Sequence, residues 1–291
     1  MELLGLTRLR RRWLALLALL VVAIAAWTAP AVGRADSYVS LGDSYTAGPL
    51  IPNQIEPPFG CLRSDHNYPH LAAPAIGFPL RDPSCSGART DHMTQPQNVD
   101  PDGPNPPQFN ALDAGTNVVS ITIGGNDIGF SEIIENCTSA TPFGSPCQDR
   151  YNSGGVDQLH ERIVGTAPKV AAVLQGIRAR SASARIFVLN YAAVFPETGN
   201  GCWPQMPVAG ADVPYLRAKQ KELNQMLADQ AAANGAAVVD WYSASIGHDA
   251  CQLPHVRWVE PVAPVNPAAP VHPNEAGMRG AANVLIAAVR G

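Results

Sequence analysis

Two segments far apart in the sequence carry residues that could together perform acyl transfer. Ser44 lies in a GDSY segment, and His272 lies in a VHPNE segment near the end of the chain. A serine hydroxyl attacks a carbonyl only when a base removes its proton, and a histidine pKa of about 6.5 suits that task. His272 is favoured over His255, the alternative in the same region, because Pro273-Asn274 is a helix-start signal. The remaining histidines are interpreted as surface or structural residues: His66, His70, His92, His160 and His248.

Two further segments could supply hydrogen-bond donors to the oxygen that becomes negative during attack on an ester. Gly87 lies in a CSGART segment and Asn126 in an IGGND segment. A glycine N–H admits close approach because the residue has no side chain, and an asparagine amide is a neutral donor. The N–H of Ser44 could be the third donor. We expect Asp43 to bond the turn backbone and Asp127 to brace its loop.

The elements that must position these residues alternate between strands and helices. Strands rich in β-branched or apolar residues are predicted at 37–43, 117–123, 185–190 and 236–241, with a weaker one near 78–80. Helices are predicted at 66–76, 157–180, 214–234 (ending at Gly235) and 274–290. This alternation predicts a three-layer α/β/α sandwich with a central parallel sheet of flavodoxin-like order. Ligands bind at the carboxyl ends of such strands, so the four segments should meet there.

The chain after residue 35 is expected to form a single domain, 36–291. Two proline-rich stretches, 96–107 and 261–273, are interpreted as stiff surface loops near the site. The stretch 137–147 is interpreted as another such loop, closed by a disulfide.

The first 35 residues have the pattern of a secretory signal peptide. A basic opening (Arg8, Arg10–Arg12) precedes an apolar run from Trp13 to Trp27, and small residues lead to Gly33-Arg34-Ala35. The apolar run is short for a membrane-spanning helix, which needs about 20 residues. We expect residues 1–35 to direct export and to be removed, with an uncleaved anchor as the alternative.

Charge argues against one class of partner. Beyond residue 35 the chain has 15 basic and 23 acidic side chains, a formal charge of −8. Such a surface repels nucleic acid and anionic membranes, so no nucleic-acid partner is expected. No stable protein partner is predicted either, and we expect a monomer.

All six cysteines lie beyond the leader, and an even number in an exported chain predicts three disulfides. Six cysteines allow 15 pairings, and the residues alone do not choose among them. Pairing of sequence neighbours is the simplest arrangement. Zinc binding is disfavoured because the chain has neither a CxxC nor an HExxH segment.

Four segments in order, LGDSYTAG, CSGART, IGGND and HPNEAG, resemble the motifs of the SGNH (GDSL-type) hydrolase family. The cysteine number and the leader are similar to those of its secreted actinobacterial lipase and esterase branch. The resemblance implies that Ser44 is the nucleophile and His272 the base. It also implies an oxyanion hole formed by Ser44, Gly87 and Asn126. Finally, it implies disulfides between neighbours: Cys61–Cys85, Cys137–Cys147 and Cys202–Cys251.

One position departs from the family pattern. The family usually has an aspartate three residues before the histidine, where this chain has Ala269. We therefore expect a Ser–His dyad, in which a backbone carbonyl near Ala269 or Pro270 accepts the His Nδ1–H and fixes the tautomer. Glu260 and Asp249 are the alternative acids.

The leading hypothesis is a secreted serine esterase or lipase that hydrolyses carboxylic esters of small molecules or lipids through an acyl-Ser44 intermediate, without a metal or other cofactor. A carbohydrate O-acetyl esterase of the same fold is the first alternative. A non-catalytic binding module is the second, with the missing aspartate as its support. A metal-dependent phosphoesterase would need a cluster such as Asp43, Asp127 and Asp240, although no ligand spacing links them.

Overall fold

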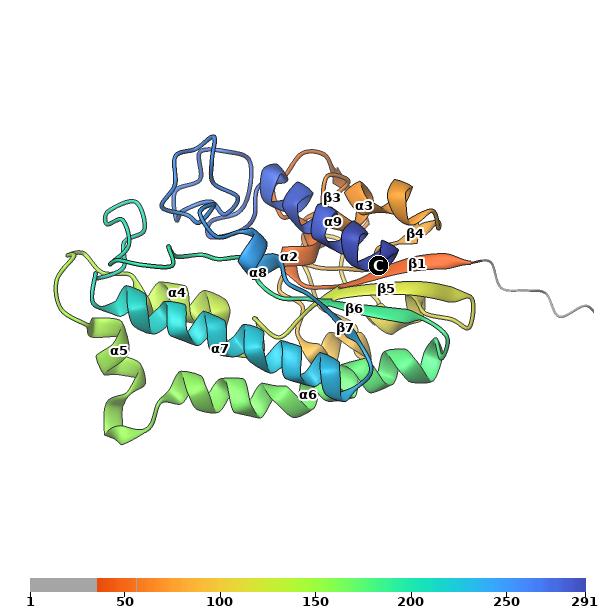
Figure 1. Ribbon diagram of the computed structural model, residues 1–291, viewed down its shortest axis with the longest axis horizontal. Helices are drawn as coiled ribbons and strands as arrows, with labels where there is room; N and C mark the ends of the chain where they lie inside the picture. Colours follow the sequence, from red (N-terminus) through yellow and green to blue (C-terminus); the bar gives the residue numbers. More distant parts are fainter. Residues whose placement is uncertain (1–35, 56) are drawn as a thin grey trace, which may run out of the picture. The chain divides into compact units, whose positions relative to one another are not determined.

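Five parallel strands form the centre of the structure, a computed structural model that describes residues 36–55 and 57–291. Their order across the sheet is β4-β1-β5-β6-β7 (Figure 1). This is the flavodoxin-like order, in which the chain reverses direction across the sheet next to β1. The strands are β1 (Ser37–Gly42), β4 (Leu80–Arg81), β5 (Thr116–Thr122), β6 (Arg185–Leu189) and β7 (Ala237–Val239). The predicted leader, 1–35, lies outside the described residues.

The central strands are buried on both faces, as their sequences predict. Every residue of β1 is buried. In β5 every residue is buried except Asn117, which is half-buried. Neither strand alternates apolar with polar residues, because helices cover both sides of a parallel sheet. The strands pair in register, with Leu41 opposite Ile121 and Val119 opposite Ile186.

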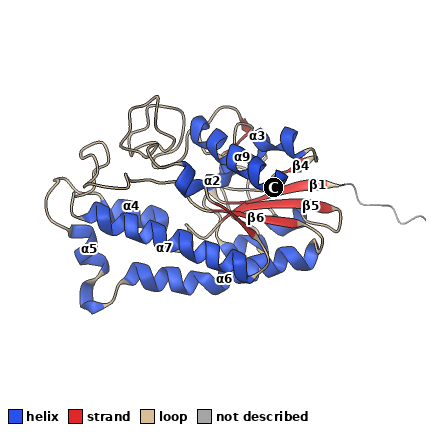
Figure 2. Ribbon diagram, viewed as in Figure 1, coloured by secondary structure: helices blue, strands red, loops and turns tan. Residues whose placement is uncertain are grey.

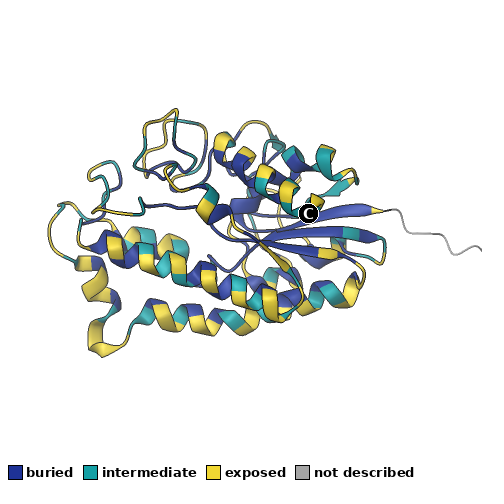
Figure 3. Cartoon of the chain, viewed as in Figure 1, coloured by how far each residue is buried: buried dark blue, intermediate teal, exposed yellow. Residues whose placement is uncertain are grey.

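Two pairs of helices form the outer layers. Helices α3 (Tyr68–Ile76) and α9 (Glu275–Arg290) pack together on one face, and α6 (Gln158–Arg180) and α7 (Asp212–Ala233) pack together on the other (Figures 1 and 2). Burial follows this arrangement, with the sheet buried and the outward faces of the helices exposed (Figure 3). The predicted three-layer α/β/α sandwich is confirmed, and all four predicted helices are present within two residues of their expected ends.

Short elements complete the described part of the chain, and the sequence pattern did not predict them as separate units. A two-residue segment is too short to show a periodicity, and a single helical turn shows little. The helices among them are α2 (Ser44–Ala47), α4 (Phe130–Cys137), α5 (Pro146–Tyr151) and α8 (Trp241–Ala244), with 3-10 turns η1 (Phe59–Cys61), η2 (Thr90–Met93), η3 (Gln108–Ala111) and η4 (Ser153–Gly155). Strands β2 (Gln54–Ile55) and β3 (Arg63–Ser64) form a small antiparallel pair.

Three disulfides join sequence neighbours: Cys61–Cys85, Cys137–Cys147 and Cys202–Cys251. These are the pairs that the family resemblance implies. The second links the end of α4 to α5 across the loop that was expected to be closed in this way. None of the helices in the described ranges has the length and apolar character needed to cross a membrane.

Candidate active site

Ser44 is the first residue of α2, immediately after β1, and is 8% exposed. The turn between the two elements requires glycine at position 42, where φ is +141° and a Cβ atom would lie 2.6 Å from the Thr122 carbonyl oxygen. The Asp43 carboxylate caps α2 by accepting the Tyr45 N–H at 2.9 Å. This confirms that Asp43 bonds the turn backbone.

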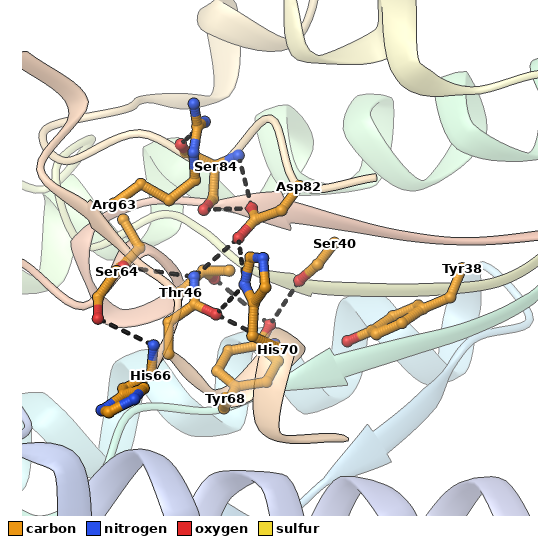
Figure 4. Close-up of polar contacts among 12 residues, drawn as sticks. Tyr38, Ser40, Thr46, Arg63, Ser64, His66, Tyr68, His70, Asp82 and Ser84 are labelled. Carbon is orange, nitrogen blue, oxygen red and sulfur yellow. Dashed lines mark hydrogen bonds and ion pairs between the residues drawn. The ribbon is translucent and has the colours of Figure 1, made fainter. Parts of the chain in front are cut away.

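Polar side chains link α2 to the neighbouring elements of the fold (Figure 4). The Thr46 and Tyr68 hydroxyls lie 3.4 Å apart, and Tyr68 also hydrogen-bonds Ser40 on β1. Asn67, which caps α3, donates to the Ala47 carbonyl at the end of α2. The helix that carries the serine is therefore attached to both the sheet and α3.

His272 lies beside Ser44, although 228 positions separate them in the sequence. Its Nε2 is 2.8 Å from Ser44 Oγ, and its Nδ1 is 2.7 Å from the Pro270 carbonyl oxygen. A carbonyl only accepts, so Nδ1 carries the proton and Nε2 is free to accept the serine proton. Burial lowers the pKa of His272, while the hydrogen bond to Pro270 opposes that change. The imidazole is therefore neutral, and able to act as a base, near pH 7.

The backbone around His272 is bent sharply to bring the ring to the serine. Val271 has φ of +59°, a left-handed conformation that is strained for a β-branched residue. The Tyr45 hydroxyl donates to the Val271 carbonyl at 2.9 Å, and the Glu260 N–H donates to the His272 carbonyl at 2.9 Å. The Tyr45 ring also contacts the imidazole, with ring centres 5.3 Å apart. These contacts position the histidine without a neighbouring acid.

The two alternative acids do not contact His272 through their carboxylates, so these hypotheses are wrong. The buried Glu260 carboxylate accepts hydrogen bonds from the backbone and side chain of Asn266 and from the side chain of Asn274. The Asp249 carboxylate accepts from the Cys251 N–H and the Gln252 side chain. Both carboxylates are used to organise the loops around them. His255 is likewise not the residue that bonds Ser44.

The expected oxyanion donors lie on loops that are tied to the nucleophile turn. The Cys85 N–H donates to the Gly42 carbonyl at 3.1 Å, and Gly87 follows with φ of +77°. Asn126 Nδ2 donates to the Ala88 carbonyl at 2.9 Å, which links the two donor loops and leaves the second amide hydrogen unused. Within residues 36–55 and 57–291, neither the Ser44 N–H nor the Gly87 N–H has a hydrogen-bond acceptor. All three donors therefore have capacity for a ligand oxygen.

The aspartates considered as metal ligands accept hydrogen bonds from other groups of the protein. Asp127 braces its loop, as expected, by accepting from the N–H and hydroxyl of Thr90. Asp240 caps α8 and accepts from Asn190. Across the described ranges, no three His, Cys, Asp or Glu side chains gather in a group that could hold a metal ion.

Sequence reasoning missed two tyrosines of the site. Tyr45 contacts His272 as described, and the Tyr191 hydroxyl bonds both Asp43 and Gly125. Tyr191 comes two residues after β6, at the same sheet edge as the other site residues. That position was a usable signal, because strand ends at this edge carry the rest of the site.

An apolar cavity lies between α4, α6 and α7, and the Tyr45 and Phe130 rings, which both contact the His272 ring, line part of it. Gly125 also belongs to its lining, and its wall is mostly apolar, with Lys219 and Gln220 as the polar exceptions. The cavity has a volume of about 70 Å³. Representative wall residues are Phe130, Ile133, Leu159, Phe195, Leu216 and Leu223.

Comparison with known proteins gives a consistent set of matches. The GDSL-like Lipase/Acylhydrolase family matches residues 40–279. Lipase 2 of Streptomyces coelicolor is 40% identical over 252 residues, which cover 83% of this chain and 82% of that relative. The crystal structure of phospholipase A1 from Streptomyces albidoflavus superposes with a TM-score of 0.72 at 27% identity, covering 87% of this chain and 99% of that chain. An extracellular lipase from Streptomyces rimosus gives 0.72 at 28% identity, covering 87% and 100%.

Proposed function

This chain belongs to the GDSL-like lipase/acylhydrolase family of carboxylic ester hydrolases, and on that premise we propose that Ser44 and His272 are its catalytic dyad. The 2.8 Å contact between Ser44 Oγ and His272 Nε2, with Nδ1 bonded to the Pro270 carbonyl, is the observation that carries this proposal. This contact supports the proposal because a serine hydroxyl beside a base, with the base oriented by a third group, is the arrangement that activates a nucleophile.

The reaction follows from this geometry. Ser44 Oγ attacks the ester carbonyl carbon while His272 Nε2 takes the hydroxyl proton. The carbonyl oxygen becomes negative and accepts hydrogen bonds from the N–H groups of Ser44 and Gly87 and from the Asn126 amide. Collapse breaks the bond to the alcohol oxygen, which leaves with the proton from Nε2. Water then attacks acyl-Ser44 with the same base, and the acid is released.

The Pro270 carbonyl replaces the usual third member of a triad. It accepts the Nδ1 proton and so selects the tautomer in which Nε2 is free. A neutral carbonyl stabilises the imidazolium less than a carboxylate does. Strained Val271 and the Tyr45 hydroxyl compensate by holding the ring in place, so that little reorganisation is needed during the reaction.

The apolar cavity supports an ester with an apolar acyl group rather than an O-acetylated glycan. The cavity has a volume of about 70 Å³, and an apolar group that enters it meets a mostly apolar wall beside the His272 ring. We propose that the cavity takes the acyl chain and that short to medium chains fit without displacing α4.

We also propose that the protein is exported. The first 35 residues have the leader pattern, and three disulfides are typical of a protein that folds in an oxidising compartment. The Streptomyces rimosus relative is described as extracellular.

Hydrolysis of p-nitrophenyl esters from acetate to palmitate tests the function. The wild-type protein should hydrolyse them with an optimum at a short to medium chain, and Ser44→Ala should lose activity by roughly 10⁴-fold or more with an unchanged melting temperature. A fluorophosphonate should label the wild type and not the variant. Activity retained by Ser44→Ala would refute the dyad, and an optimum at palmitate would refute the role of the cavity.

A further inference from the structure

The hydroxyl of Tyr191 connects two loops whose relative positions matter for the proposed reaction. It donates to Asp43 Oδ2 at 2.5 Å, in the nucleophile turn. It accepts the Gly125 N–H at 2.7 Å, in the loop that carries Asn126. The phenol is buried, so neither contact is replaced easily by water.

The direction of each hydrogen bond is determined by chemistry. The Gly125 N–H can only donate, so the Tyr191 oxygen accepts from it and the phenol proton points to Asp43. Burial and the nearby Asp43 charge raise the pKa of Tyr191, so the phenol keeps that proton. Asp43 is therefore an acceptor at both oxygens, from Tyr191 at one and from the Tyr45 N–H at the other.

Tyr191 is itself held rigidly. Asn224 on α7 accepts the Tyr191 N–H and donates to its carbonyl, each at 2.9 Å. The Tyr191 ring lies edge-on to Tyr45, with centres 5.0 Å apart, and Tyr45 in turn contacts His272. A single side chain from the end of β6 thus reaches the turn after β1, the loop after β5 and, through Tyr45, the histidine.

We propose that Tyr191 is a positioning residue, whose hydroxyl aligns Ser44 with the Asn126 donor by joining Asp43 to Gly125. This inference rests on the proposed function of the dyad and the oxyanion donors. Without the hydroxyl, the buried Gly125 N–H and Asp43 Oδ2 each lose a partner. The loop that carries Asn126 then moves relative to Ser44, and stabilisation of the negative oxygen decreases.

The ionisation of Asp43 makes this role measurable. Burial raises the pKa of Asp43 to about 7, and the Tyr191 hydrogen bond opposes the rise. The other groups that face Asp43 are the Tyr45 N–H, which also lowers the pKa, and the Asp127 charge, which raises it. A protonated carboxyl carries a hydrogen on one oxygen, which weakens that oxygen as an acceptor, so the paired arrangement favours the ionised form. Loss of the Tyr191 hydroxyl should raise the pKa of Asp43 further.

Tyr191→Phe tests the proposal because it keeps the ring and removes only the hydroxyl. We expect kcat and the rate of fluorophosphonate labelling to fall roughly tenfold to hundredfold. The acid limb of the kcat/KM profile, which lies at about pH 7 when ionised Asp43 is required, should move to higher pH. Tyr38→Phe is the matched control. It removes another buried phenol hydroxyl, 2.7 Å from the Ser120 hydroxyl, and Tyr38 lies near the start of β1, whereas Ser44 follows the end of that strand.

Two results separate the outcomes. A Tyr191→Phe enzyme with the labelling rate and acid limb of Tyr38→Phe, whatever its melting temperature, would overturn the positioning role. If the Ser44→Ala variant keeps the activity of the wild type, the proposed dyad is refuted. That result is independent of Tyr191.

Discussion

Each residue of the proposed dyad is supported by a segment that contains a buried carboxylate, and the balance of burial and hydrogen bonding shifts the pKa values of the two carboxylates in opposite directions. On the serine side, Asp43 receives two hydrogen bonds, and burial raises its pKa to about 7. On the histidine side, burial alone would raise the pKa of Glu260, but hydrogen bonds from Asn266, Val265 and Asn274 outweigh it and lower that pKa. Asp43 therefore titrates close to neutral pH, whereas Glu260 is ionised there.

The difference follows from the elements that each carboxylate organises. Asp43 lies between a strand and a helix, which provide most of the backbone hydrogen bonds themselves. Glu260 lies in a long segment without helix or strand, between α8 and α9, where the carboxylate is the organising acceptor. Its partner Arg257 is buried too, with 3.7 Å between the charged atoms. The fold of the irregular half therefore depends on an acid that stays ionised, whereas the fold of the regular half tolerates an acid that titrates near pH 7, even though activity is expected to need its ionised form.

The largest expected effect comes from Glu260→Gln. The amide replaces an acceptor with a donor that faces N–H groups, and it leaves Arg257 buried without its counter-charge. Breaking a buried pair in this way costs about 3–5 kcal/mol of unfolding free energy. Activity should fall with it, because the Glu260 N–H and the segment that it organises position His272. Urea unfolding and kcat measure the two effects.

Glu275→Gln is the matched control for that experiment. Glu275 is half-exposed at the start of α9, pairs with Arg279 and lies 3.4 Å from His66 Nδ1, so its loss should change stability by about 1 kcal/mol or less. Equal destabilisation by both substitutions would contradict the special role of Glu260.

A smaller effect, with a distinctive pH dependence, is expected for Asp43→Asn. Between about pH 4, where an unfolded aspartate titrates, and about pH 7, the native state holds a proton on Asp43 that the unfolded state has lost. Asp43 therefore contributes a decrease in the wild-type free energy of unfolding as pH rises through this range. Glu260 acts in the opposite sense, since its contribution is present above the unfolded pKa and is lost as pH falls through its lowered pKa. Asp43→Asn should flatten the Asp43 part of the curve, and a melting temperature series from pH 4 to pH 8 checks this. An unchanged slope would show that Asp43 is ionised throughout.

The smallest effect is expected for Asn266→Ala. This change removes one side-chain donor to Glu260 and leaves the backbone N–H in place, so about 1 kcal/mol should be lost. The pKa of Glu260 should rise, so the midpoint of acid unfolding should move to higher pH. An unaltered midpoint would mean that the backbone donors alone keep Glu260 ionised.

Much of the fold was predictable because its signals are local. Runs such as 117–123 are long and apolar, and the helix predicted at 214–234 is followed by the capping glycine Gly235. Four segments that each follow a predicted strand or precede a predicted helix identified Ser44, Gly87, Asn126 and His272 as candidates. In a parallel sheet, strand ends gather at one edge, so these residues could be placed together without coordinates.

The acid partner and the supporting tyrosines could not be predicted in the same way. Glu260 and Asp249 looked equally available in the sequence, and only the structure shows that other donors already occupy them. Tyr191 is 148 positions from Asp43, and no local pattern marks a hydroxyl that bonds at such a distance.

The sequence by itself therefore determined the order of strands and helices, the candidate dyad and the absence of an aspartate at position 269. These depend on residue type and spacing. Only the tertiary structure decided that the Pro270 carbonyl orients His272, because a backbone oxygen has no signature in the sequence and acts through the path of the chain. The same holds for the ionisation of Asp43 and Glu260, because a pKa depends on burial and on donors that long-range packing brings together.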